Sequence, residues 1–240
     1  MSSEKNLKDK KKRKKDNYLL YDFVKVTGAL PALCWLRPKK YYPFGKPNLK
    51  GAVLISANHR SLVDPITLLV SFPTRRLNCL ATKDLYSSKF METFFNKMHC
   101  IKVDKDNFSM ASFHQVVERL KEGRAVAIFP EGQVNTTGGD SLLTFKSGAV
   151  LMAHKSGAPL LPVYIAERKK WYQRQRIVVG ERIDIKSLVG KIPTIEELNK
   201  ASELLRDKEI ELREYYESIM SKKKNKNKKQ KEIKEEVTKK

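Results

Sequence analysis

Between residues 51 and 179, short apolar runs alternate with segments in which apolar residues recur at helical spacing. Short apolar runs are typical of buried strands, whereas spacings of three and four residues are typical of amphipathic helices. The runs that predict strands are 52–57, 77–82, 100–103, 125–129, 159–166 and 176–179. The segments that predict helices are 65–72, 85–97, 113–120, 149–155 and 195–220. This alternation predicts a single α/β domain, residues 43–221, with a largely parallel sheet flanked by helices.

Residues 18–42 form the most membrane-like segment of the chain. Its apolar part is interrupted by Asp22, Lys25, Gly28 and Pro31. A helix that spans a bilayer needs about 20 nearly uninterrupted apolar residues, and this segment fails that test. The pattern favours an amphipathic, kinked segment in the membrane interface, with Trp35, Tyr41 and Tyr42 at the level of the lipid headgroups. The alternative is a helix packed on the core of its own domain.

The two ends of the chain carry much of its net charge of +22. Residues 1–17 hold eight Lys or Arg against three acids, and residues 222–240 hold ten Lys against three Glu. Like charges in such runs repel one another and stay solvated, so we predict that both ends are disordered basic arms. Positive charge of this kind favours binding to nucleic acid, to an anionic membrane or to an acidic protein.

The three cysteines, Cys34, Cys79 and Cys100, form no C-x-x-C pair. Their spacing argues against a zinc site and favours a reducing, cytoplasmic setting. The basic start is not followed by a clean apolar stretch that ends in small residues, so the sequence predicts no secretory signal.

The predicted strand 52–57 runs directly into the sequence Asn58-His59-Arg60-Ser61-Leu62-Val63-Asp64-Pro65. Residues five apart on a helix point about 140° away from each other, so His59 and Asp64 meet only across a loop or turn. Proline disfavours helical backbone in the residue before it and is favoured at the first helical position, so Asp64 is expected to cap the helix 65–72. A carboxylate beside an imidazole fixes its tautomer and raises its basicity. The alternatives are that Asp64 is only a helix cap and that His59 is a loop histidine without a role.

A second polar cluster, Phe129-Pro130-Glu131-Gly132, begins at the last residue of the predicted strand 125–129. An acid at the exit of a strand, beside a glycine that lets a ligand approach the backbone amides, suits the binding of a polyol or phosphate headgroup. In isolation the same residues fit an ordinary tight turn.

Together these blocks resemble the glycerolipid acyltransferases typified by 1-acylglycerol-3-phosphate O-acyltransferase. The N-H-x-S-x-x-D block of that family is present as Asn58, His59, Ser61 and Asp64. The F-P-E-G block is intact at 129–132, with F-K-x-G at 145–148 and P-V-x-I as Pro162, Val163 and Ile165. The order and spacing of the blocks agree with the family over residues 51–166.

Two departures from the family pattern bear on the acceptor. The Thr-Arg that follows F-P-E-G in the family is replaced by Gln133-Val134, and its V-D-R is present as Val103-Asp104-Lys105. The family's arginines are associated with gripping the acceptor's phosphate. Lys105 supplies a point charge without the fork of an arginine, and Val134 supplies no charge. Arg60 and Lys83 are candidates to compensate.

The resemblance implies an O-acyltransferase of phospholipid synthesis at the cytoplasmic face of the membrane. It would move a fatty acyl group from acyl-CoA or acyl-carrier protein to the free hydroxyl of 1-acylglycerol 3-phosphate, with no cofactor and no metal. His59 is implied as general base and Asp64 as the residue that orients it, while Ser61 is expected to brace the loop rather than to attack. The residues implied in substrate binding are Asn58, Arg60, Ser61, Lys83, Lys105, Pro130, Glu131 and Gly132. Glycerol 3-phosphate, another lysolipid and a non-phosphorylated alcohol are alternative acceptors.

Three other classes of protein are weighed against this reading. A nucleic-acid-binding protein is suggested by charge alone, because the body lacks interleaved stacking aromatics and any helix-turn-helix or zinc pattern. A catalytically silent scaffold is opposed by the intact His59 and Asp64. A metal hydrolase that uses both of these with Glu131 is opposed by the histidines, four in number and none at ligand spacing.

Overall fold

The computed structural model describes residues 18–104, 109–136 and 142–238. Its strands form one seven-stranded sheet in the order β1-β7-β6-β2-β5-β3-β4. The strands are β1 (Lys39–Tyr41), β2 (Val53–Ala57), β3 (Leu77–Thr82), β4 (Ile101–Val103), β5 (Ala125–Ile128), β6 (Leu160–Ile165) and β7 (Arg176–Val179). The strands β6, β2, β5, β3 and β4 run parallel to one another, whereas β7 is antiparallel to β6 and parallel to β1. The predicted α/β fold with a largely parallel sheet is confirmed.

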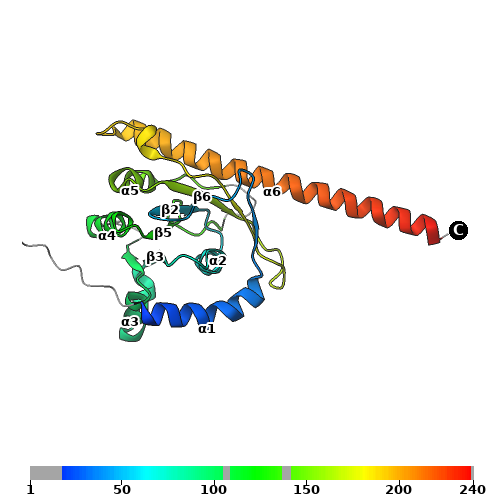
Figure 1. Ribbon diagram of the computed structural model, residues 1–240, viewed down its shortest axis with the longest axis horizontal. Helices are drawn as coiled ribbons and strands as arrows, with labels where there is room; N and C mark the ends of the chain where they lie inside the picture. Colours follow the sequence, from blue (N-terminus) through cyan, green and yellow to red (C-terminus); the bar gives the residue numbers. More distant parts are fainter. Residues whose placement is uncertain (1–17, 105–108, 137–141, 239–240) are drawn as a thin grey trace, which may run out of the picture.

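Helices cover both faces of the sheet. The helices are α1 (Leu19–Leu36), α2 (Asp64–Ser71), α3 (Lys89–Lys97), α4 (Met110–Lys121), α5 (Gly148–Ser156) and α6 (Ile195–Thr238), with 3₁₀ turns η1 (Lys83–Tyr86) and η2 (Ile185–Ser187). Figure 1 shows α1, α2 and α3 on one side of the sheet and α4, α5 and α6 on the other. Because both faces are covered, the central strands β2, β5 and β6 are buried along their whole length and read as continuous apolar runs.

The carboxyl ends of two neighbouring central strands bring the sequence blocks together. In the register of β2 and β5, Ser56 lies opposite Ile128, and β6 places Val163 opposite Ala57. Both strands run in the same direction, so the loops that follow them leave the sheet at the same edge. Ligands of open α/β sheets bind at this edge. The blocks at 58–64 and 129–132 are therefore neighbours.

The segment predicted to lie in the membrane interface, residues 18–42, divides into two elements. Residues 19–36 form the continuous helix α1, which contains Pro31, and residues 39–41 form the edge strand β1 paired with β7. The prediction missed this strand because three polar and aromatic residues carry no strand periodicity. Among the described helices, α1 is the one long and apolar enough to cross a membrane by length and composition alone, with 18 residues and a mean hydropathy of 1.3. This differs from the expectation that the interruptions at Asp22, Lys25, Gly28 and Pro31 exclude a spanning helix.

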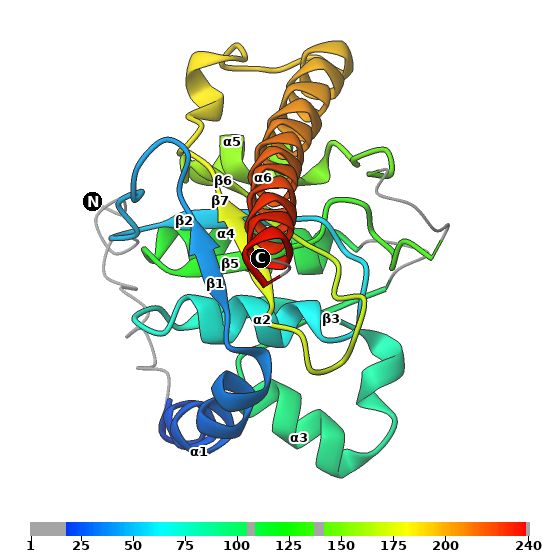
Figure 2. The ribbon, with the colours of Figure 1, turned by 90° about the vertical axis from the view of Figure 1, so that its right-hand side faces the viewer.

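The last helix is longer than the pattern of apolar residues predicts. It continues to Thr238, past the apolar stripe that ends near residue 220, and projects beyond the body of the molecule (Figure 1; Figure 2 looks along it). The prediction of a disordered arm at 222–240 is therefore wrong for residues 222–238, which are helical. Lys, Gln and Glu are good helix formers, and this composition extends a helix without tertiary packing. The arm predicted at 1–17 lies outside the described residues.

Candidate active site

His59 and Asp64 meet across a tight loop between β2 and α2. Nδ1 of His59 lies 3.1 Å from Oδ2 of Asp64, and the same oxygen accepts hydrogen bonds from the backbone N–H groups of Arg60 and Ser61, each at 2.7 Å. The Asp64 carboxylate is buried, and the imidazole stacks on the ring of Phe129 with centroids 4.1 Å apart. A carboxylate on Nδ1 favours the tautomer that leaves Nε2 free to accept a proton. The two side chains make the contact that the sequence predicted, and their roles as base and orienter stay a prediction.

Asp64 does not cap α2, contrary to the expectation from the sequence. The N-cap of α2 is Val63, which has helical backbone angles and makes no side-chain cap, and Asp64 is already the first residue of the helix. Its carboxylate turns back over the preceding loop, where it contacts two backbone N–H groups and the imidazole. This acid therefore shapes the loop rather than the helix end.

Two polar residues of the same block brace the loop. The side chain of Asn58 is fully buried, donates to the carbonyl oxygen of Ile165 at 3.1 Å and accepts from its N–H at 2.7 Å. Oγ of Ser61 accepts a hydrogen bond from the N–H of Val63 at 3.2 Å, in agreement with a bracing rather than a nucleophilic role. Asn58 thus ties the loop to β6.

Glu131 holds the two loops together and is buried. Its Oε1 accepts from the N–H of His59 at 3.0 Å, and its Oε2 accepts from the N–H of Leu143 at 3.2 Å. Burial raises the pKa of the Glu131 carboxyl, and these two N–H donors offset part of the rise. The sequence analysis expected this acid to contact the acceptor, but both of its oxygens are engaged by backbone. A buried acid directly after a strand was visible in the sequence, whereas its backbone partners were not.

A cavity of about 350 Å³ opens beside the imidazole at the carboxyl ends of β3, β4 and β5. We call it the catalytic cavity; its lining includes His59, Thr82, Pro130, Gly132, Lys146 and Ser147. The two sequence blocks at 129–132 and 145–148 meet here, since the N–H of Lys146 donates to the carbonyl oxygen of Pro130 at 3.0 Å. Pro130 and Gly132, both predicted in substrate binding, thus lie beside the proposed base. Lys146 belongs to the F-K-x-G block, but the sequence predicted no role for it.

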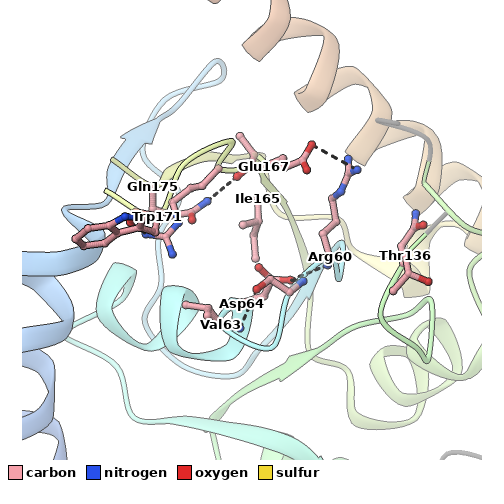
Figure 3. A pocket seen from close by; sticks show the side chains of 12 residues that line it. Arg60, Val63, Asp64, Thr136, Ile165, Glu167, Trp171 and Gln175 are labelled. Atoms are coloured by element: carbon pink, nitrogen blue, oxygen red, sulfur yellow. Dashed lines mark hydrogen bonds and ion pairs between the residues drawn. The ribbon is translucent and has the colours of Figure 1, made fainter. Parts of the chain in front are cut away.

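The cations predicted to bind the acceptor lie in different places. Nζ of Lys83 forms an ion pair of 2.6 Å with Asp104, whose side chain lines the catalytic cavity. Arg60 instead faces a second cavity of about 390 Å³ on the other side of the loop. There its guanidinium extends away from Asp64 toward Glu167, with 3.7 Å between Nη2 and Oε2 (Figure 3). Lys105 lies outside the described residues.

A third cavity, of about 490 Å³, is almost entirely apolar. It lies between α1, α2, β3 and α3, and we call it the apolar cavity. Its lining includes Gly28, Ala29 and Ala32 of α1, Leu62 of the loop between β2 and α2, and Leu80 of β3. Leu80 also lines the catalytic cavity, so the two cavities share this residue of β3. No spacing in the sequence indicated this cavity, because its walls come from elements far apart in the chain.

The sequence and the fold have counterparts among known proteins. The family model described as Acyltransferase matches residues 36–166. The 1-acyl-sn-glycerol-3-phosphate acyltransferase of Bacillus subtilis is 30% identical over 177 residues, which cover 70% of this chain and 86% of that protein. The enzyme of the same name from Borreliella burgdorferi is 29% identical over 62% of this chain, but the match spans only 60% of that protein's length. The crystal structure of the 1-acyl-sn-glycerophosphate acyltransferase PlsC from Thermotoga maritima superposes with a TM-score of 0.57 at 23% identity, over 81% of this chain and 79% of that chain.

Proposed function

The chain belongs to the acyltransferase family, and from this premise we propose that it acylates the free hydroxyl of 1-acylglycerol 3-phosphate. The donor would be acyl-CoA or acyl-carrier protein, and the product a phosphatidic acid for phospholipid synthesis. The observation that carries this proposal is the 3.1 Å contact between His59 and Asp64 beside a cavity able to admit a small polar acceptor. The names of the relatives support the choice of acceptor.

In the proposed mechanism, His59 is the general base. Asp64 holds the proton on Nδ1, so Nε2 takes the proton of the acceptor hydroxyl as its oxygen attacks the thioester carbonyl. The C–O bond forms, the C–S bond breaks, and the proton passes to the leaving thiolate. An unactivated hydroxyl holds its proton far above neutral pH, so a positioned base contributes about 10²–10⁴-fold to the rate.

The acyl chain of the donor would enter the apolar cavity. This cavity is lined by Leu62 of the loop between β2 and α2 and shares Leu80 with the catalytic cavity. A thioester carbonyl near the imidazole would therefore leave its chain against apolar walls, where burial of each methylene contributes roughly 0.8 kcal/mol.

The experiment that tests the mechanism compares His59→Ala and Asp64→Asn with wild type in detergent. Acyl transfer to 1-acylglycerol 3-phosphate is measured with both donors, and circular dichroism verifies folding. We expect His59→Ala to lose at least about 10²-fold in turnover. His114→Ala is the matched control, because His114 is exposed on α4 and lines none of the three cavities described here. Near wild-type turnover of a folded His59→Ala variant would exclude the mechanism.

Proposed association with the membrane follows from the outer face of α1. One face of this helix packs on the domain through the buried Tyr21, whose hydroxyl donates to the carbonyl oxygen of Leu77 at 3.3 Å and accepts from its N–H at 2.8 Å. The opposite face exposes a stripe of apolar side chains, Leu19, Phe23, Val26 and Leu30. Helices with such a stripe lie in the interface plane of a bilayer. The basic ends of the chain would add attraction to anionic lipid at the cytoplasmic face.

A further inference from the structure

The catalytic cavity contains a lysine that is not part of an ion pair. Lys146 lines this cavity together with His59, and its Nζ and Cε lie 3.0 Å from the point where a Cβ on Gly132 would stand. Within the described residues, the ammonium group makes no ion pair and no side-chain hydrogen bond. An ammonium group of this kind is a ready ligand for an anion.

The backbone at Lys146 is held firmly on the F-P-E-G loop. Its N–H donates to Pro130, and the preceding Phe145 is buried in the core beneath α5. Gly132 has a φ of +72° and no side chain, so the lysine side chain passes directly over it. The two blocks 129–132 and 145–148 therefore build one wall of the catalytic cavity, with the ammonium group on that wall.

Of the other cations predicted to bind the acceptor, Lys105 lies outside the described residues, and the two that are described are engaged elsewhere. Lys83 is paired with Asp104, and Arg60 faces Glu167 in the cavity on the far side of the loop. At the position of the family's arginine after F-P-E-G stands Val134, which carries no charge. Among the described residues, the cationic side chain that lines the catalytic cavity is Lys146.

We propose that Lys146 binds the phosphate monoester of the acceptor and selects phosphorylated acceptors; this rests on the proposed function. The acceptor's hydroxyl and phosphate sit on one three-carbon glycerol backbone, so a hydroxyl at His59 keeps its phosphate within the same small cavity. The phosphates of a CoA donor are separated from the thioester by the long pantetheine arm and fall outside it. The first residues of α5, Gly148 and Ala149, also line the cavity and add the partial positive charge of a helix start.

The first test measures binding rather than turnover. Glycerol 3-phosphate is titrated calorimetrically into wild type, Lys146→Met, Lys146→Arg and His59→Ala. We expect Lys146→Met to bind at least tenfold more weakly, Lys146→Arg to bind within about threefold of wild type, and His59→Ala to retain binding. The matched control is Lys155→Met, because Lys155 is an exposed lysine of α5 that does not line the cavity.

The second test separates acceptor from donor. With 1-acylglycerol 3-phosphate as acceptor, Lys146→Met should raise the KM for acceptor at least tenfold and leave the KM for acyl-CoA within twofold. With monoacylglycerol, which lacks the phosphate, any measurable transfer should be unaffected by the substitution.

The outcomes of the two tests distinguish this proposal from the proposed function. Wild type that binds glycerol 3-phosphate through Lys146 but acylates no lysophosphatidic acid would remove the proposed function and keep the anion site. Lys146→Met that binds and turns over like wild type would overturn the anion site and leave the acyltransferase reaction intact. A rise in the KM for acyl-CoA alone, or wild type without measurable glycerol 3-phosphate binding, would also overturn it.

Discussion

At the level of single residues, the site depends on two buried carboxylates that bind backbone N–H groups. Oδ2 of Asp64 accepts hydrogen bonds from two backbone N–H groups of the loop between β2 and α2. Glu131 accepts from the backbone N–H groups of His59 and Leu143. Charge-assisted hydrogen bonds of this kind are shorter and stronger than neutral ones. The imidazole is therefore held by Asp64 and by the ring of Phe129, while Glu131 holds the backbone N–H of the same residue.

A third buried acid lies behind these two and has no role in the proposed reaction. Glu209 of α6 is fully buried, and its Oε1 accepts a hydrogen bond from Oγ of Ser56 at 2.7 Å, while no described residue bonds to Oε2. Burial raises the pKa of the Glu209 carboxyl well above its usual value, and the nearby Glu131 raises it further. The folded protein therefore keeps a proton that the unfolded chain releases near pH 4.5.

This proton linkage predicts the pH dependence of Glu209→Gln. Above pH 4.5 the folded state binds more protons than the unfolded state, so Glu209 lowers the free energy of unfolding as the pH rises. The slope is at most about 1.4 kcal/mol per pH unit, and the effect ends once the pH passes the folded-state pKa. The neutral Gln removes this term, so the stability of the variant relative to wild type should rise as the pH rises above 4.5. Urea unfolding across this range measures the difference. A difference between the two proteins that stays constant with pH would contradict the assignment.

At the level of elements, α1 packs on the domain through one face and exposes apolar side chains on the other. Its inner face is anchored by Tyr21 and by the ion pair between Asp22 and Arg76, and its outer face is the apolar stripe. The two readings offered by the sequence, an interfacial segment and a helix packed on its own domain, are therefore compatible. Membrane association itself remains a proposal.

The stripe predicts how membrane binding responds to charge. The double variant Phe23→Glu/Leu30→Glu should partition at least tenfold more weakly onto vesicles, because fully burying each apolar side chain contributes roughly 1.5–3 kcal/mol. The matched control is Ile192→Glu/Ile195→Glu, which adds the same charges at exposed apolar residues near the start of α6. Vesicle sedimentation with and without anionic lipid, at low and high salt, separates the stripe from the basic ends. Unchanged binding of the stripe variant would exclude α1 as the contact.

At the scale of the whole molecule, the apolar cavity and the catalytic cavity lie at different places on the sheet. The apolar cavity lies on the α1 and α2 side, and the catalytic cavity opens at the carboxyl edge where the two motif loops meet. The long helix α6 packs on the opposite side, against β6 and β7, and supplies Glu209 beneath the site. In the proposed reaction, the apolar cavity would hold the donor's acyl chain and the catalytic cavity would hold the acceptor.

The apolar cavity predicts a change in acyl chain preference. Ala29 of α1 lines the apolar cavity, so Ala29→Phe should shorten the space for the chain and shift product toward shorter acyl groups. Thr27→Phe is the matched control, because Thr27 is exposed on the outer part of the same helix. Mass spectrometry of products from a mixture of acyl-CoA chain lengths measures the shift. An unchanged distribution from a folded Ala29→Phe variant would place the acyl chain elsewhere.

Much of the fold followed from local patterns. The buried strands and their covering helices were predictable because apolar periodicity reports which side of each element meets the core. The short edge strand β1 was missed because its pairing with β7 depends on a partner 137 residues away, at Lys39 and Arg176. The extension of α6 was missed because charge density was taken as disorder, although the same residues favour helix.

By itself, the sequence determined that His59 and Asp64 share a loop and that this loop and the F-P-E-G block each follow a buried strand. Those are short-range facts, set by turn chemistry and by the order of elements along the chain. Only the tertiary structure decided that Glu131 binds backbone, that Arg60 and Lys146 face different cavities, and that α1 closes an apolar space. Such outcomes depend on which strands become neighbours, and that choice is made by packing the whole sheet rather than by any one segment.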